Sequence, residues 1–78
     1  MEYNILGIII RQPKVTGEKL QDLFLQFGCI IKTRLGLNRE EINEGIIILD
    51  LNGDQHQIEL FINKLDTIKG IEYRHIKL

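Results

Sequence analysis

Several residue types are missing or rare in this sequence, and their absence excludes whole classes of chemistry. The 78 residues contain no alanine, no serine and no tryptophan, and only one cysteine and one proline. Without serine there is no serine nucleophile, and a single Cys29 excludes both an internal disulfide and a metal site built from cysteines alone. One unpaired thiol is typical of the reducing cytoplasm, where we expect this protein to reside.

Long apolar runs and an excess of one charge are also missing. No run approaches the roughly 18 residues of a membrane span, so we expect no membrane partner, and the first four residues lack the basic start of a signal peptide. Ten basic and 11 acidic residues give a formal net charge of −1. Proteins that bind nucleic acid are normally clearly basic, so composition gives no support for that partner. The length allows one domain, residues 1–78.

Large aliphatic residues are abundant, with 15 isoleucines and 11 leucines, and they fall into two kinds of pattern. Apolar side chains at positions i, i+3, i+4 and i+7 predict one helix from about Gly17 to Phe27 and a second after Asp54. We expect Asp54 to cap the second helix with Gln57 reaching back to it, and glycines 28 and 70 to end the two helices. Short isoleucine-rich runs predict four strands, at residues 3–10, 29–37, 45–51 and 71–78, with a polar hairpin loop at 38–44.

The resulting order of strand, helix, strand, strand, helix, strand predicts an α+β, ferredoxin-like βαββαβ fold. Right-handed crossovers then place the strands of one antiparallel sheet in the order four, one, three, two, with both helices on one face. The central strands, one and three, carry apolar residues on both faces, so one apolar face stays uncovered. We expect it to pack on another subunit through Ile5, Ile9, Ile46 and Ile48. The alternative is that Lys32 and Arg34 cover it with their long side chains.

Few residues carry recognisable chemistry. Arg11 and Lys14 lie in the loop before the first helix and could hold an anion as an acylphosphatase-like enzyme does, but two solvated loop cations are the preferred interpretation. Cys29 is expected to be a buried small hydrophobe rather than a reactive thiol. The third strand has no aromatic platform for RNA, and two histidines, at positions 56 and 75, give no metal-ligand spacing.

The chain nevertheless resembles a known group, the ACT-like regulatory domains, over nearly its whole length. It is most similar to stand-alone iron-only hydrogenase system regulators, also described as transcriptional regulators, and its second half resembles the C-terminal domain of nickel-responsive repressors. The features that carry this resemblance are Ile5–Ile9, Phe27–Gly28, Arg34–Leu37, Gly45–Ile48 and Leu65–Ile71. The resemblance implies pairing of subunits through their sheets and binding of small molecules, often amino acids, at subunit interfaces.

Three departures limit what the resemblance implies. Nickel repressors place histidine ligands in strand two, where this chain has Arg34 and Gly36, so we expect no metal. Their DNA-binding domain precedes this fold, whereas this sequence opens on strand one, so we expect no direct contact with nucleic acid. The amino-acid-binding loop usually has glycine after its proline, and here Lys14 follows Pro13.

We therefore expect a non-enzymatic ACT-like module, a transcriptional or metabolic regulator, that forms a dimer or tetramer through its sheet and senses a small-molecule effector. We expect no cofactor and no catalytic residue. The ligand site is expected in two segments, which contribute Gln12, Pro13, Lys14, Arg34, Gly36 and Asn38. The alternatives are a structural subunit of a larger complex and the acylphosphatase-like enzyme described above.

Overall fold

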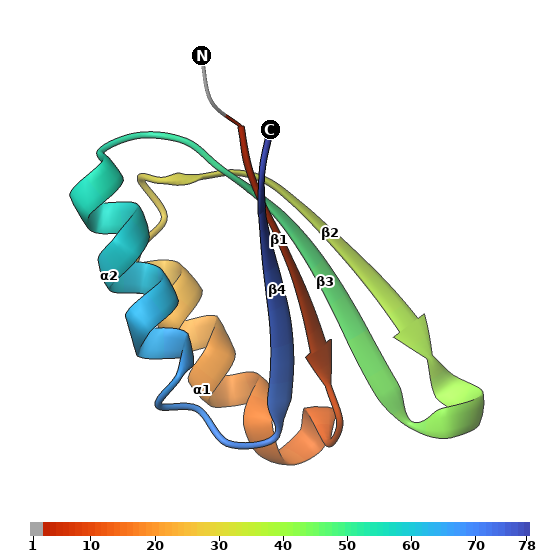
Figure 1. Cartoon of the computed structure of the whole chain (residues 1–78). Coiled ribbons are helices and arrows are strands. Elements are labelled where there is room, and N and C mark those ends of the chain that lie inside the picture. The colour runs from red at the N-terminus through yellow and green to blue at the C-terminus, as the bar shows by residue number, and fades with distance from the viewer. Residues whose placement is uncertain (1–2) are drawn as a thin grey trace.

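The computed structural model describes residues 3–78, and of residues 38–40 it describes the backbone only. Four strands form one antiparallel sheet in the order β2-β3-β1-β4, which confirms the ferredoxin-like α+β fold and the predicted strand order (Figure 1). A single 3₁₀ turn, Glu40–Ile42, joins the two strands of the β2–β3 hairpin. The elements are β1 (Asn4–Ile10), α1 (Pro13–Gln26), β2 (Ile31–Arg39), β3 (Glu44–Leu51), α2 (Gln55–Leu65) and β4 (Ile71–Lys77).

The molecule has two layers, because both helices lie on the same face of the sheet (Figure 1). Side chains of β1 and β3 alternate strictly between buried and half-buried, as expected for central strands with one covered face. The covered face contributes Leu6, Ile8 and Ile10 from β1, and Ile47, Leu49 and Leu51 from β3. The other face of the sheet, which we call the open face, has no helix over it.

The helices complete the core through the predicted apolar stripes. Phe61 of α2 is fully buried, and its ring centre lies 5.3 Å from that of Phe27 and 6.1 Å from that of Phe24. These separations are within the range of stabilising aromatic pairs, so the three rings hold α1 and α2 together at the centre of the helical layer. Burying each large apolar side chain contributes roughly 1.5–3 kcal/mol.

The structure corrects the predicted start of the first helix. It begins at Pro13, four residues before the predicted Gly17, because proline at the first helical position loses no hydrogen bond and already has a helical φ. The residues before Leu20 carry no apolar stripe, so periodicity alone missed this first turn. Gly28 does not adopt a left-handed conformation, and α1 ends instead on the backbone bond from Phe27 to Leu23.

Other local expectations also change. Asp54 is the N-terminal cap residue of α2, but its side chain makes no capping hydrogen bond, so the capping box with Gln57 is wrong. Gly70 is left-handed, at φ +88°, but it precedes β4 and lies several residues beyond the end of α2. Cys29 is exposed rather than buried, because it lies in the turn between α1 and β2.

The β2–β3 hairpin is longer than predicted and extends past the helices (Figure 1). β2 continues through Arg39, so most of the predicted hairpin loop is strand or 3₁₀ turn. The pairing register of β2 with β3 shifts between Ile31 and Thr33. Gly36 pairs regularly with Ile47.

Candidate functional site

The open face of the sheet is an apolar surface that no helix covers. The strand register arranges its side chains in rows across β2, β3, β1 and β4. One row is Leu35, Ile48, Gly7 and Arg74, and the next is Leu37, Ile46, Ile9 and Glu72. The row on the other side is Thr33, Asp50, Ile5 and Ile76.

The four isoleucines predicted for an oligomer interface all lie on this open face. Ile5, Ile9, Ile46 and Ile48 are half-buried by their neighbours within the sheet. Sequence reasoning missed three further members of the patch, which are more exposed: Leu35 at 54%, Leu37 at 41% and Ile76 at 52%. They belong to the edge strands, where alternating charged residues concealed the apolar face.

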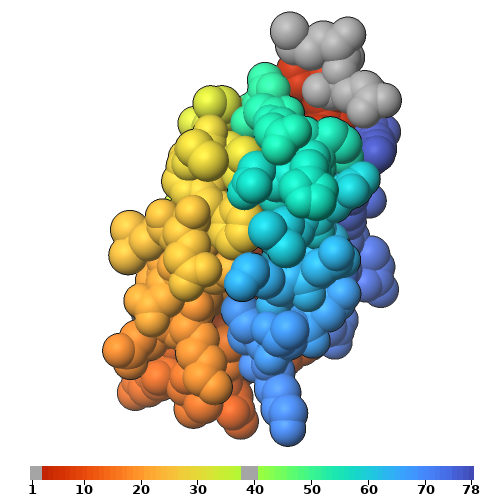
Figure 2. Space-filling view, turned by 90° about the vertical axis from the view of Figure 1, so that its left-hand side faces the viewer, coloured from red at the N-terminus to blue at the C-terminus, as the bar shows by residue number. Residues whose placement is uncertain are grey.

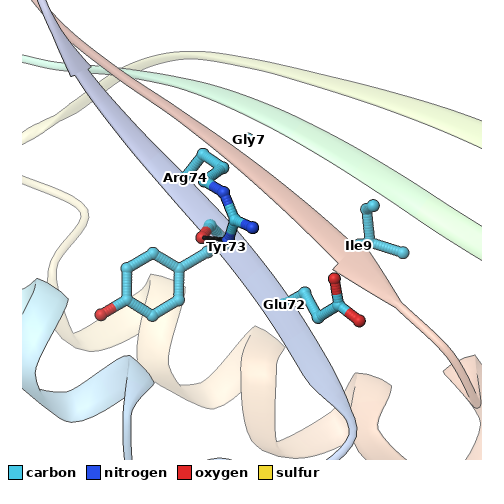
Figure 3. Close-up of a pocket in the computed structure, with 5 residues that line it drawn as sticks. All are labelled: Gly7, Ile9, Glu72, Tyr73 and Arg74. Carbon is cyan, nitrogen blue, oxygen red and sulfur yellow. Dashed lines mark hydrogen bonds between the residues drawn. The ribbon is translucent and has the colours of Figure 1, made fainter.

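The centre of the open face is a hollow, because Gly7 has no side chain there (Figure 3). The hollow has a volume of about 270 Å³ and is lined by Gly7, Ile9, Glu72, Tyr73 and Arg74. A Cβ atom added at Gly7 would lie 3.8 Å from Cδ1 of Ile48, an ordinary contact. The hollow therefore marks unfilled space within an apolar face rather than a tight backbone approach.

An ion-pair cluster closes one end of the open face. Arg11, just after β1, donates hydrogen bonds to Glu44 of β3 and, over 2.9 Å, to Glu72 of β4. The guanidinium holds the pKa of Glu72 below its ordinary value of 4.5, and the two carboxylates raise the pKa of Arg11. Because two carboxylates already surround Arg11, it is poorly placed to hold a phosphate, and the geometry does not favour the acylphosphatase-like alternative.

The predicted ligand-binding residues divide between two places. Gln12 is the N-terminal cap residue of α1, and Pro13 and Lys14 form its first turn, so this segment is a helix start rather than a free loop. Pro13 lies next to Gly45 in β3, since its Cγ would be 3.8 Å from a Cβ added there. The backbone of Asn38 pairs with the same Gly45, but its side chain lies outside the described residues.

Arg34 and Gly36 lie on the helix-facing side of β2, opposite Leu49 and Ile47. The guanidinium of Arg34 lies 4.9 Å from the ring centre of Phe24 and donates a 3.0 Å hydrogen bond to Gln21. The ammonium of Lys32 donates to the carbonyl oxygen of Cys29. Neither long side chain therefore covers the open face, which excludes the alternative raised from the sequence.

The two histidines lie apart from these features. Nε2 of His75 is 2.9 Å from the side-chain oxygen of the buried Asn4, and His56 is exposed in the first turn of α2. Within residues 3–78, apart from the side chains of 38–40, no three metal-binding side chains gather. None of the helices in this range is long and apolar enough to cross a membrane.

A groove on the helical layer was not anticipated from the sequence. It runs between α1 and the turn after α2 and is lined by Lys19, Lys64 and Lys69, together with Thr16 and Thr67. The only available signal was weak: Lys19, Asp22 and Gln26 share a helical face beside the apolar stripe of α1. Lysines on a helix surface are so common that this spacing alone indicates nothing.

Comparison with known proteins places this fold in a family. Residues 2–75 match the family described as "TM1266-like: Iron-only hydrogenase system regulator, putative". The chain belongs to this TM1266-like family, as the resemblance in the sequence implied. A comparison with curated proteins finds no match.

The solved structures that are similar to this chain include three of different kinds. The uncharacterized protein TM1266 from Thermotoga maritima is 26% identical, with a TM-score of 0.89 over 100% of this chain and 99% of that one. A formyltetrahydrofolate deformylase from Pseudomonas putida KT2440 is 8% identical, with a TM-score of 0.64 over 94% of this chain and 28% of that one. CPII, a nitrogen regulatory PII-like protein from Thiomonas intermedia K12, is 15% identical, with a TM-score of 0.59 over 100% and 91%. The deformylase and the PII-like protein are similar to this chain in fold only.

Proposed function

We propose that this protein is a non-enzymatic regulatory module that assembles by packing the open faces of two sheets against each other and responds to a small-molecule effector. The main observation in support is the open face, where seven large apolar side chains have no helix over them. Burying the part of each side chain that is still exposed contributes a fraction of the roughly 1.5–3 kcal/mol for a fully exposed residue, which favours association. A domain of under about 80 residues also gains stability from a partner.

The remaining support comes from family and neighbours. The family is one of regulators, and the structurally similar PII-like protein is described as bound to ADP, AMP and bicarbonate. A regulator works when its effector prefers one arrangement of subunits and thereby shifts the population. The free Cys29 fits the cytoplasm, and the net charge of −1 favours regulation through a small molecule or protein rather than through direct contact with nucleic acid.

The test is the mass of the purified protein in solution, measured by light scattering and by native mass spectrometry. We expect a dimer or tetramer for the natural sequence and a monomer for Ile48→Asp, because a carboxylate at the centre of the interface would be buried without a partner. Leu25→Asp is the matched control: Leu25 is 80% exposed on α1, outside the open face, so the oligomer should persist.

The outcomes separate the alternatives. A natural protein that is monomeric over a wide concentration range contradicts the proposed self-association and favours a different protein over the open face, as in a structural subunit. An oligomer that Ile48→Asp leaves intact means that association uses another surface. Extra mass retained by the oligomer would identify an effector directly.

A further inference from the structure

The helical layer contains a groove that the proposed assembly would leave accessible. It consists of two adjoining hollows of about 320 and 380 Å³, which share Lys19 and Thr67. Figure 2 views this side of the molecule, where a furrow separates α1, in orange and yellow, from α2 and the following turn, in cyan and blue. Because the helices cover the opposite side of the sheet from the open face, packing of two open faces does not cover this groove.

Three ammonium groups from different segments line the groove. Lys19 comes from α1, Lys64 from the last turn of α2, and Lys69 from the turn before β4. The only acidic residue in the lining is Asp22, so three lysines and one aspartate give a formal charge of +2, in a chain whose net charge is −1. This is a local reversal of the sign of the whole molecule.

The three lysines are exposed, and no ion pair of the described residues accounts for their place in the lining. None forms an ion pair with any carboxylate whose side chain the structure describes. Asp66, two residues after Lys64, accepts a 2.6 Å hydrogen bond from the hydroxyl of Tyr73. The three ammonium groups therefore keep their hydrogen-bond donors for another acceptor.

Lysines near the end of a helix often serve its free carbonyls, but here those carbonyls already have partners. The backbone N–H of Asp66 donates to Asn63, that of Thr67 to Lys64, and that of Ile68 to Leu65. The hydroxyl of Thr67 adds a 2.7 Å bond to the carbonyl of Lys64. The carbonyls of Asn63, Lys64 and Leu65 therefore have partners without any ammonium group.

The shape and chemistry of the groove select the kind of anion. Lysine presents a compact point charge with three donors, which suits phosphate oxygens. Charges distributed along an elongated groove match an extended polyanion better than a single small anion. The apolar side chains of Leu23 and Ile68 also line it and provide a surface for an uncharged part of the ligand.

We propose that this groove binds a small molecule carrying two or more phosphate groups. Such a molecule would be the effector of the proposed regulator, and its regulatory role rests on the proposed function. Binding itself does not depend on the oligomer, because every lining residue comes from one chain.

The test is a titration of the full chain with inorganic tripolyphosphate. Calorimetry measures the binding, and amide chemical shifts locate it. We expect saturable binding and shifts concentrated at residues 15–26 and 64–69. Lys19→Gln/Lys64→Gln should weaken binding by about tenfold or more, because each substitution removes a charge-assisted hydrogen bond. The matched control, Lys32→Gln/Lys77→Gln, makes the same change in net charge outside the groove and should weaken binding less than about twofold.

Each result decides the proposal. Equal losses of affinity in the two double variants would show that tripolyphosphate is attracted to cationic surface in general, and would overturn the proposed site. The absence of saturable binding by the natural protein would also overturn it. If the protein proves monomeric but binds tripolyphosphate with the expected pattern, the proposed assembly fails and the groove proposal stands.

Discussion

Arg34 lies over Phe24, with its guanidinium carbon 4.9 Å from the centre of the ring, although the two residues belong to different layers of the fold. This contact joins the edge strand β2 to the buried face of α1, and Gln21 holds the guanidinium from the same helix. The charge of Arg34 is therefore used to attach β2 to the helical layer. Arg34, which was predicted to bind a ligand, thus also makes a structural contact.

Removing this contact should lower stability without affecting assembly. We expect Arg34→Ala to reduce the free energy of unfolding by roughly 0.5–1 kcal/mol, the range for a cation over an aromatic ring at an exposed site. Urea unfolding measures the change. Arg74→Ala is the control, because its guanidinium donates only to the carbonyl of the adjacent Tyr73 and should matter less. Equal losses in the two variants would show that the ring contact contributes nothing.

Stability should fall in acid partly through Glu72. Arg11 holds the pKa of Glu72 below 4.5 in the folded protein, so this carboxyl stabilises the fold above about pH 4.5. That contribution disappears as the pH falls through the lower folded-state pKa. The raised pKa of Arg11 has no effect in this window, since arginine stays protonated throughout.

Thermal melting between pH 2 and 7 measures this effect. We expect Glu72→Gln to have a flatter melting profile below pH 4.5 than the natural protein, and the difference to shrink in high salt because the pair is exposed. Glu59→Gln, on the exposed side of α2, should keep the natural slope. A natural slope in Glu72→Gln as well would mean that the Arg11 cluster contributes nothing to acid stability.

Two glycine substitutions should act in opposite directions. Gly70→Ala should destabilise the fold by about 1–3 kcal/mol, because φ is +88° and the new Cβ would lie 2.9 Å from the hydroxyl oxygen of Thr16. Gly17→Ala, inside α1 with nothing within 4 Å, should stabilise it by about 0.5–1 kcal/mol. Denaturant midpoints of both variants test the pair, and a stabilising Gly70→Ala would contradict the backbone geometry described here.

The fold was predictable because its signals are periodic. The stripes Leu20–Phe27 and Ile58–Leu65 and the isoleucine-rich strands each specify one element, and the crossover rule then fixes the strand order. The ends of elements were less predictable because they depend on single residues. Pro13 reads equally well as a loop residue and as a helix start, and Asp54 caps α2 by position without a side-chain bond.

The candidate site was less accessible from sequence because it depends on which face each side chain occupies. Ile46 and Ile48 were placed correctly on the open face by alternation from a central strand. Leu35 and Leu37 join them only through the pairing register with β3, and the three lysines of the groove meet only in three dimensions. The spacing of residues along the chain does not predict that Lys19 and Lys69 line the same groove.

The alternation along β3 also has a consequence for how its register is specified. Residues 46–49 are all large and aliphatic, so a slip of one position would exchange Ile47 and Leu49 for Ile46 and Ile48 with little loss of apolar burial. The ends of the strand prevent it, because a slip would carry the carboxylate of Asp50 beneath the helices, where it has no partner. Asp50 thus helps to decide which isoleucines of β3 form the core and which lie on the open face.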